Sequence, residues 1–358
     1  MGRKKQYVTM SDIARDMGVS VNTVSRALRG KDDISEAMRK RIEERAKEMG
    51  FIRNTFASSL RTNQTNIIGV ILEDSSNPFF SEVFKGIEEA AQKQNYQLIL
   101  MNSKENYKTE RTAIEILLSR RVDGLIISPV EKNYDDLKRL EETNFPMLII
   151  GRYIKELKKS DQIYSDDYKG GYLAAKHFAQ QDRTNPLALM INKTNSTSQY
   201  RLKGFEDGVK EEGLELNKEH KKFLLEKAAE TDYYISDSDI SLQYAFNTVE
   251  TMIKGGKEFD AIFCFNDMMA LGVLKALKKH HIRCPEDVSV IGFDDIFFAS
   301  LSTPSLTTLR IKKHTLGIKA FQMIMDRITK KRTTQRLEKL DVELIQREST
   351  SLGATPKS

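Results

Sequence analysis

The most informative polar side chains of this sequence stand on one expected helix near the amino terminus. Between residues 20 and 29, Val24 and Leu28 are spaced to lie inward, and the opposite face carries short or flexible hydrogen-bonding side chains. Arginine suits the acceptor edge of guanine, and asparagine suits that of adenine. The pattern therefore predicts a helix that reads the major groove of DNA. The members of this face are Asn22, Thr23, Ser25, Arg26 and Arg29.

A second group of polar side chains follows short apolar runs that are typical of buried strands. Carboxylates, amides and guanidinium groups can form paired hydrogen bonds with a hydroxyl-rich ligand, and aromatic rings can pack on its apolar faces. Ligands of doubly wound sheets bind beyond the carboxyl ends of the strands. The candidate ligand-binding residues are Asn77, Phe79, Arg152, Arg201, Asn266 and Asp294, with Glu73 and Tyr234 as secondary candidates. A structural ion pair of Arg201 and Asp294, and a turn at Asn77, are the alternatives.

The motifs of common enzyme classes are missing from the sequence. There is no Gly-x-x-x-x-Gly-Lys-Ser/Thr loop, no Gly-x-Gly-x-x-Gly after an expected strand, and no Gly-x-Ser-x-Gly elbow. The five histidines show no paired spacing of metal ligands. We therefore expect no catalytic residue, no metal site and no cofactor.

The DNA-reading helix must be held by neighbouring helices. Ser11 can cap a preceding helix that ends at Gly18, and Ser20 can cap the reading helix itself. A third helix is expected to start at Ser35 and to stop at Gly50, since glycine suits the left-handed backbone after a helix. Two helices joined by a tight glycine turn predict a helix-turn-helix unit. A three-helix bundle with a solvated polar face is the alternative that helix spacing alone leaves open.

From residue 66 onward, short apolar runs alternate with longer amphipathic stretches. Buried strands separated by helices indicate parallel sheets, and two such series predict an α/β fold with two doubly wound subdomains. The expected strands are Ile67–Leu72, Gln97–Met101, Gly124–Ser128, Met147–Ile150, Leu187–Ile191, Ala261–Phe265 and Val288–Ile291. The expected helices are Phe80–Gln94, Lys108–Arg120, Tyr134–Thr143, Gly170–Gln180, Arg201–Glu212, Leu242–Lys254 and Met268–His280.

The literal residues of the head resemble a known family. The runs Val8-Thr9-Met10-Ser11-Asp12-Ile13-Ala14 and Gly18-Val19-Ser20-Val21-Asn22-Thr23-Val24-Ser25-Arg26 resemble the head of the lactose/galactose-repressor (LacI/GalR) family of bacterial transcriptional regulators. The resemblance extends from about Tyr7 to Glu348, and it implies a type I periplasmic-binding-protein-like core behind an all-α head. The DNA contacts that it implies in the head are Thr9, Ser20, Val21, Asn22, Thr23, Ser25, Arg26 and Arg29.

Residues 54 to 61 resemble the hinge helix of that family. Eight residues are too few for a stable isolated helix, so we expect this segment to fold on binding DNA. The resemblance gives Leu60 the role of an apolar wedge that opens a base step from the minor groove. It implies further DNA contacts for Asn54 and Ala57. Ser58 departs from the family, which often carries arginine there, and this puts one backbone contact in question.

These signals divide the chain into a head, a hinge, a core and a tail. The core consists of two subdomains, because the resemblance implies that the chain crosses between them near Tyr164, Ile311 and Asp341. The expected parts are the DNA-binding head 1–53, the hinge helix and linker 54–64, the core 65–348 with an N-subdomain of about 65–164 plus 311–340 and a C-subdomain of about 165–310 plus 341–348, and a flexible tail 349–358.

The charge of the chain is concentrated at its amino terminus. Residues 1–64 hold 14 Lys and Arg against 8 Asp and Glu, so their net charge of +6 equals that of the whole chain. A basic head on a neutral core is typical of a nucleic-acid-binding module attached to another domain. The first residues lack the apolar stretch of a signal peptide, and Cys264 and Cys284 suggest reduced thiols, so we expect a cytoplasmic protein without a membrane segment.

Taken together, the sequence predicts a transcriptional repressor that binds a near-palindromic operator as a homodimer. A small effector in the core is expected to control operator affinity, and the family resemblance favours a sugar. A corepressor-dependent regulator that responds to a nucleobase or a protein partner is the alternative within this class. A sugar-binding protein without a regulatory role and a sugar-modifying enzyme are the alternatives from other classes.

Overall fold

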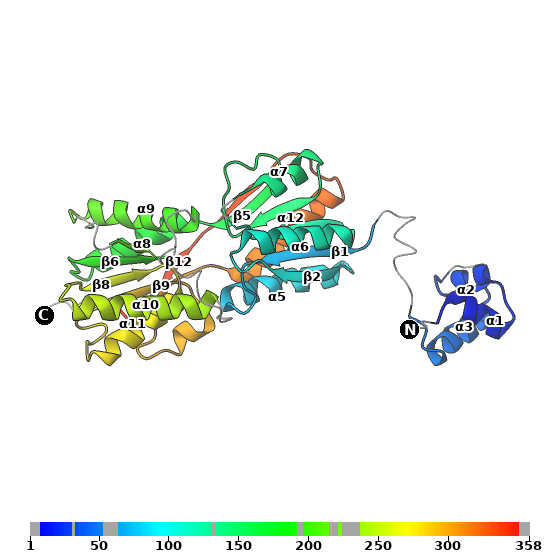
Figure 1. Ribbon diagram of the computed structural model, residues 1–358, viewed down its shortest axis with the longest axis horizontal. Coiled ribbons are helices and arrows are strands. Elements are labelled where there is room, and N and C mark those ends of the chain that lie inside the picture. Colours follow the sequence, from blue (N-terminus) through cyan, green and yellow to red (C-terminus); the bar gives the residue numbers. More distant parts are fainter. Residues whose placement is uncertain are drawn as a thin grey trace, which may run out of the picture. The chain divides into compact units, whose positions relative to one another are not determined.

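The computed structural model describes residues 8–30, 33–52, 64–130, 133–191, 196–214, 216, 221–223 and 237–350. The chain divides into two compact units, Met1–Thr65 and Asn66–Ser358 (Figure 1). No helix in these ranges is long and apolar enough to cross a membrane. The predictions for Asn54, Ala57, Leu60 and Tyr234 lie outside the described residues and stay predictions.

The described part of the head consists of three short helices around an apolar centre. The helices are α1 (Met10–Met17), α2 (Val21–Ala27) and α3 (Glu36–Glu48). Ile13, Val24 and Ile42, one from each helix, are fully buried. Gly18 follows α1 with φ +66°, and this left-handed backbone makes the tight turn into α2. The arrangement confirms the predicted helix-turn-helix.

The caps of these helices follow the sequence prediction with one exception. Ser20 caps α2 by accepting a hydrogen bond from the N–H of Thr23 at 3.0 Å, and Ser35 caps α3. The prediction that Ser11 caps α1 is wrong, because the helix begins earlier. Thr9 occupies the cap position, and its N–H donates to the carboxylate of Asp12 at 2.9 Å in a reciprocal capping box.

The first sheet in the described part of the core has six strands, and all of its strand pairs are parallel. Its strand order is β11-β5-β4-β3-β1-β2. The strands are β1 (Ile67–Leu72), β2 (Gln97–Asn102), β3 (Gly124–Ile127), β4 (Met147–Ile150), β5 (Asp161–Ser165) and β11 (Leu337–Leu340). The covering helices are α5 (Pro78–Lys93), α6 (Tyr107–Ser119), α7 (Asp135–Glu142) and α12 (Lys313–Ile328). We call this part of the core the N-subdomain.

A second six-stranded sheet follows the same plan among the described residues. Its order is β12-β10-β9-β8-β6-β7, and β12 runs antiparallel to β10. The strands are β6 (Pro186–Met190), β7 (Lys221–Phe223), β8 (Ala261–Cys264), β9 (Ser289–Asp294), β10 (Thr307–Arg310) and β12 (Glu343–Ile345). The helices are α8 (Asp167–Ala179), α9 (Ser196–Glu211), α10 (Asp237–Lys254), α11 (Asp267–Lys279) and the 3-10 helix η3 (Phe297–Ser300). We call this part the C-subdomain.

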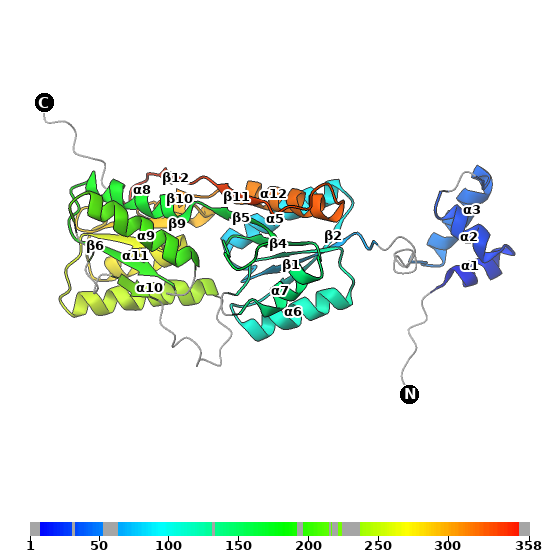
Figure 2. The ribbon, with the colours of Figure 1, turned by 90° about the horizontal axis from the view of Figure 1, so that it is seen from above.

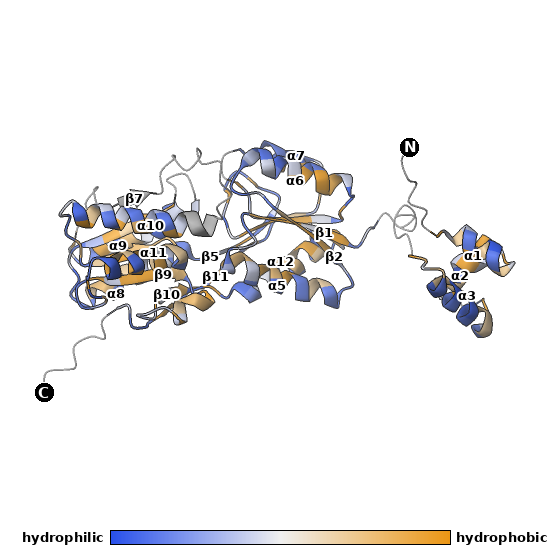
Figure 3. Ribbon diagram, turned by 60° about the horizontal axis from the view of Figure 1, so that its bottom comes forward, coloured by the Kyte–Doolittle hydropathy of each residue, from blue (hydrophilic) through white to orange (hydrophobic). Residues whose placement is uncertain are grey.

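Each sheet is buried between two pairs of helices. In the N-subdomain, α5 and α12 cover one face, and α6 and α7 cover the other. In the C-subdomain, α10 and α11 cover one face, and α8 and α9 cover the other. Figure 3 shows the apolar strands inside and hydrophilic outer faces on the helices. Strands buried on both faces explain the continuous apolar runs of the sequence, so the predicted doubly wound α/β class is confirmed.

Three short segments connect the two sheets, and all three leave the carboxyl ends of their strands (Figure 2). β5 leads into α8, β10 leads into α12, and β11 leads into β12. Because these links are only a few residues long, they hold the carboxyl edges of the two sheets next to each other. Ion pairs lie beside two of the links, Lys169 with Asp341 at 2.5 Å and Lys312 with Glu343 at 3.3 Å.

The ordered core extends past the boundary predicted for the tail. Ser349 and Thr350, placed in a flexible tail by the sequence, are buried. The hydroxyl of Ser349 donates to the carbonyl of Val290 at 2.6 Å, and the hydroxyl of Thr350 lies 2.9 Å from Nε2 of His177. These residues are polar and follow the last strand, so no apolar pattern marked them as core.

Candidate DNA-reading and effector sites

Helix α2 presents the candidate base-reading side chains on the outside of the head. On α2, Val21, Asn22 and Arg26 are exposed while Val24 faces inward. Arg29, which the sequence places on the same helix, is exposed in the turn that follows α2. Two other candidates are already engaged at the helix cap: the hydroxyls of Ser20 and Thr23 lie 2.8 Å apart. The amino end of α2 is therefore fixed by its cap, and the exposed guanidinium of Arg26 is a hydrogen-bond donor on its outer face.

Two predicted DNA contacts have partners within the head. The guanidinium of Arg26 forms an ion pair with the carboxylate of Asp33. The side chain of Thr9 completes the capping box of α1 with Asp12, and hydrogen bonds from Thr9 lower the pKa of that carboxyl. An exposed ion pair of this kind is weak, so Asp33 can release Arg26 to a base or a phosphate.

Arg201 is the centre of the polar group in the C-subdomain. It lies on α9 and is almost completely buried. Its Nε donates to Oδ1 of Asp167 at 2.9 Å, and its Nη1 donates to the carbonyl of Phe265. The guanidinium carbon lies 3.5 Å from the ring centre of Phe293, a cation–π contact. These contacts fix the plane of the guanidinium.

Asp294 faces Arg201 from the end of β9. Its Oδ1 lies 3.7 Å from Nη2 of Arg201, so the structure brings together two candidates that are far apart in the sequence. Burial raises the pKa of Asp294 to about 7, although the nearby Arg201 opposes that shift. Asp294 has φ +106° and Asp295 has φ +53°, which are rare for residues with a side chain. Backbone strain of this kind is concentrated at functional sites.

Asn266 is held in place as a helix cap. Its Oδ1 accepts a hydrogen bond from the N–H of Met269 at 2.9 Å at the start of α11. The neighbouring Asp267 is completely buried, accepts from the N–H of Ile296 at 2.8 Å and from the hydroxyl of Thr308, and has a pKa raised well above its usual range by burial. Asp267 therefore braces the loop that carries Asp294.

In the N-subdomain, Arg152 is buried in a group of carboxylates. Its Nη2 donates to Oε1 of Glu73 and lies 3.4 Å from Oε1 of Glu105. The hydroxyl of Ser128 also donates to Glu73 at 3.1 Å. Burial raises the pKa of Glu73 to about 8, although Arg152 opposes the shift. The sequence predicted Arg152 as a ligand contact, but it gave no sign of this ion pair.

Asn77 and Phe79 lie at the start of α5, where the two subdomains meet. Oδ1 of Asn77 accepts from the N–H of Phe79 at 3.0 Å and caps the helix. The ring of Phe79 packs against the apolar clusters of both subdomains. Phe79 is thus the predicted site residue that touches both halves of the core.

Several residues of the site carry no strong signal in the sequence. Asp167 and Asp267 each precede or begin a helix, and only the pairs Asp166-Asp167 and Asn266-Asp267 could have drawn attention to them. Glu105 and Ser128 stand in loops after β2 and β3, and nothing in their local pattern separates them from ordinary loop residues.

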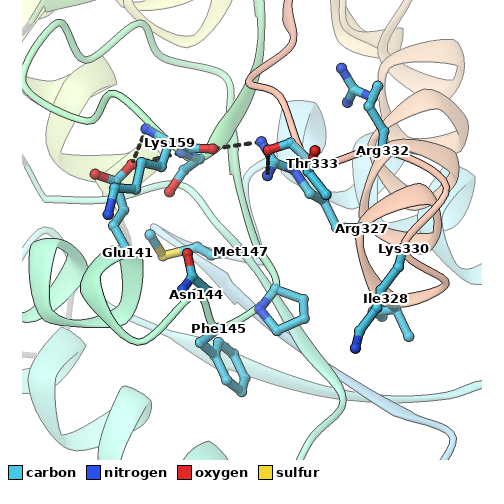
Figure 4. A pocket seen from close by; sticks show the side chains of 12 residues that line it. Glu141, Asn144, Phe145, Met147, Lys159, Arg327, Ile328, Lys330, Arg332 and Thr333 are labelled. Carbon is cyan, nitrogen blue, oxygen red and sulfur yellow. Dashed lines mark hydrogen bonds between the residues drawn. The ribbon is translucent and has the colours of Figure 1, made fainter.

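A separate pocket of about 370 Å³ lies at the amino-terminal edge of the first sheet (Figure 4). None of the predicted site residues lines it. Arg327 donates there to the carbonyl of Thr333 at 3.0 Å and to Oδ1 of Asp161 at 2.8 Å. Glu141 accepts from the N–H of Ser160 at 2.7 Å. These side chains join the end of α12 to the loop before β5, which is a structural role.

The head and the two-part core together define the class: the protein is a DNA-binding transcriptional regulator with a periplasmic-binding-protein-like core. The family model of bacterial regulatory proteins of the lacI family matches residues 9–54. The model of periplasmic binding proteins and the sugar binding domain of the LacI family matches residues 65–348. The chain therefore belongs to the LacI family, as the resemblance indicated.

Individual relatives extend over nearly the whole chain. The chain is 32% identical over 342 residues to the HTH-type transcriptional repressor PurR of Photobacterium profundum, covering 95% of this chain and 98% of the relative. The crystal structure of the lac repressor dimer bound to operator and the anti-inducer ONPF has a TM-score of 0.82, is 24% identical, and covers 97% of this chain and 100% of that one. A LacI family regulator from Enterococcus faecalis V583 with bound ribose has a TM-score of 0.68, is 29% identical, and covers 80% and 98%.

Proposed function

We propose that this regulator is a repressor whose affinity for a near-palindromic operator is set by a sugar bound between the two subdomains. The observation that carries the proposal is the facing pair of Arg201 and Asp294 above the ring of Phe293. A guanidinium and a carboxylate at this spacing can bind adjacent hydroxyl groups, and the buried ring of Phe293 supports the guanidinium from one side. The ribose bound to the Enterococcus faecalis regulator supports this ligand class.

The ring of Phe79 favours a second candidate, a planar nucleobase that acts as a corepressor. It packs on the apolar clusters of both subdomains, and a base could stack on it while Arg152 and Glu73 form hydrogen bonds with its edge. The two candidates predict opposite responses: a sugar inducer releases the operator, whereas a corepressor is required for binding it.

We also propose that the DNA contacts are made by the outer face of α2 and by the hinge. Val21, Asn22 and Arg29 would meet base edges, and Arg26 would exchange Asp33 for a base or a phosphate. Asn54, Ala57 and Leu60 would complete the contacts in the minor groove. A head of this size reads one half-site, so a near-palindromic operator needs two chains.

The surface around η3 supports a homodimer. Phe297, Phe298 and Leu301 are 67%, 49% and 61% exposed. A cluster of large apolar side chains on a monomer is a common mark of a protein interface. A second copy of this chain is the occupant that a two-fold symmetric operator requires, and the lac repressor structure holds a dimer on its operator.

A thermal-shift screen followed by an operator titration tests the proposal. The purified chain is heated with D-ribose, other monosaccharides, cellobiose and the purine bases, since a ligand of the folded state raises the melting temperature. Each ligand that raises it is added to the protein on an operator selected from random duplexes. Release by a sugar is the expected result. Retention only in the presence of a base would replace the sugar proposal with the corepressor, and no shift with any of these ligands would refute both.

The Arg201→Ala variant locates the ligand. It should abolish the thermal shift, because the remaining partners of the ligand lose a charge-assisted hydrogen bond. Arg283→Ala is the matched control: Arg283 lies in the same subdomain and pairs with Asp287, but it is exposed. An equal loss of the shift in both variants would contradict the assigned site.

A further inference from the structure

Lys313 is a buried lysine at the junction of the two subdomains. It is the first residue of α12, directly after the second link between the sheets. Only 4% of its side chain is exposed, whereas the side chain of the preceding Lys312 is 64% exposed and pairs with Glu343. A cation at the amino end of a helix is opposed by the helix dipole, and burial of an ammonium group is costly. Its position therefore needs a specific set of partners.

Two of those partners are carbonyl groups of the strained loop in the C-subdomain. Nζ of Lys313 donates to the carbonyl of Asp294 at 2.6 Å and to the carbonyl of Asp295 at 2.7 Å. Both residues have positive φ. The ammonium group thus stabilises the positive-φ backbone of Asp294 and Asp295 through their carbonyl groups. The carboxylate of Asp294 lies 3.7 Å from the guanidinium of Arg201. Any shift of Asp294 towards a ligand would move the two carbonyls that Lys313 binds.

The third partner belongs to the N-subdomain. An ammonium group has three N–H donors, and Oε2 of Glu82 on α5 lies 3.7 Å from Nζ of Lys313. Glu82 is on the first turns of the helix that Asn77 caps and from which Phe79 contacts both subdomains. Lys313 therefore joins the Asp294–Asp295 loop of the C-subdomain to two helices of the N-subdomain: α12, on which it stands, and α5, through the carboxylate of Glu82.

Helices α5 and α12 transmit such a contact because they are packed without any gap. A Cβ atom on Gly86 would lie 2.1 Å from the carbonyl oxygen of His314, and one on Gly317 would lie 2.0 Å from that of Val83. The backbones of the two helices touch directly at these glycines. Direct backbone contact leaves little room for one helix to shift without displacing the other.

We propose that Lys313 is the positioning residue that couples the effector site to the N-subdomain. It transmits the position of the Asp294–Asp295 loop to α5 and α12, and through them to the subdomain that continues into the hinge. The inference rests on the proposed function, because it requires an effector that contacts Asp294. Allosteric coupling requires contacts that differ between two conformations of the protein, and Lys313 would provide such contacts.

Adjacent lysines provide the test and its control. Lys313→Met keeps the length of the side chain and removes the ammonium, and Lys312→Met makes the same change on the exposed neighbour. The sugar or base selected by the thermal-shift screen is titrated into each variant, and operator affinity is measured without ligand and at saturating ligand. Saturation ensures that weaker ligand binding is not mistaken for weaker coupling. The ratio of the two operator affinities is the coupling factor.

Lys313→Met is expected to bind the operator within about threefold of the parent without ligand, and to lose at least tenfold in the coupling factor. Lys312→Met should keep the parental factor. A parental factor in Lys313→Met would overturn the relay and leave the proposed function intact. A ligand that binds the parent but never changes its operator affinity would instead refute the proposed function, and the relay with it.

If Lys313→Met fails to fold, Glu82→Gln takes its place. This change removes only the charge on the N-subdomain side, and Glu88→Gln on the exposed face of α5 is its control. Glu82→Gln should lower the coupling factor about threefold at unchanged ligand affinity, because the loop around Asp294 is untouched. A coupling factor equal to that of Glu88→Gln would exclude transmission through Lys313 and Glu82.

Discussion

Effector binding should strengthen as the pH rises through 7, because Asp294 changes its protonation state there. Burial raises the pKa of Asp294 to about 7, so the carboxyl is about one-tenth ionised at pH 6 and about nine-tenths ionised at pH 8. The ionised form can accept hydrogen bonds from two ligand hydroxyls. If only that form binds, affinity rises about tenfold from pH 6 to pH 8, or about 1.4 kcal/mol.

Calorimetric titrations of the selected ligand at pH 6, 7 and 8 measure this slope. Asp294→Asn should bind more weakly than the parent does at pH 6 and show no slope. Asp295→Asn is the control at the next position. Burial raises the pKa of Asp295, but hydrogen bonds from Arg310 and Arg347 lower it below its usual value, so Asp295 stays ionised from pH 6 to pH 8. The slope of the parent should persist in that variant.

Titration of Glu73 is the other possible source of such a pH dependence. Burial raises its pKa to about 8, so it titrates in the same window from the N-subdomain. A slope that survives in Asp294→Asn would belong to another group such as Glu73 and would remove Asp294 from the ligand contacts. A parent that binds equally well at pH 6 and pH 8 would lead to the same conclusion.

Four further outcomes test the head, the hinge and the stability of the core. Arg26→Ala should cost about 1–3 kcal/mol on the selected operator and almost nothing on random DNA in anisotropy titrations, and equal losses on both would show that Arg26 contacts only phosphates. Leu60→Ala should reduce operator bending along with affinity in gel-shift assays, and amide protons of residues 54–61 should become protected from exchange only on the operator. Glu110 accepts from the N–H of Val130 at 2.6 Å, and burial raises its pKa to about 7. The folded chain then holds a proton that the unfolded chain releases above its ordinary pKa, so stability falls by up to about 3 kcal/mol as the pH rises towards 7. Glu73 and Asp294 also have raised pKa values and add to the fall, so Glu110→Gln should make it shallower by about that amount in urea titrations. An unchanged pH dependence would argue against the shifted pKa. Asp161 is fully buried and accepts from Arg327 and Arg332, so Asp161→Ala should cost about 3–5 kcal/mol of unfolding free energy, and a loss below about 1 kcal/mol would mean that the arginines find other partners.

The sequence predicted what depends on short-range patterns. Gly18 and Ser20 define the helix-turn-helix because a glycine turn and a hydroxyl cap are local features, and the apolar runs predicted strands that are buried on both faces. The sequence also placed Arg201 and Asp294 in one site, but most other long-range pairs could not be predicted. Glu73 and Arg152 stand 79 residues apart, so only the fold reveals that they pair. Lys313 reads as one of two adjacent lysines at a helix start, and only the path of the chain buries one and exposes the other.

Among the candidate ligand residues, a helix-capping role is hard to distinguish from a ligand-binding role in this fold. In a doubly wound sheet a strand ends where the next helix begins, so the residue nearest a ligand is also the residue at the helix cap. Asn77 and Asn266 both cap a helix through Oδ1, and each retains an amide nitrogen that can donate to a ligand oxygen. A capped side chain is already ordered, so little entropy is lost when it binds. The two roles are compatible, so a side chain that caps a helix can also contact a ligand.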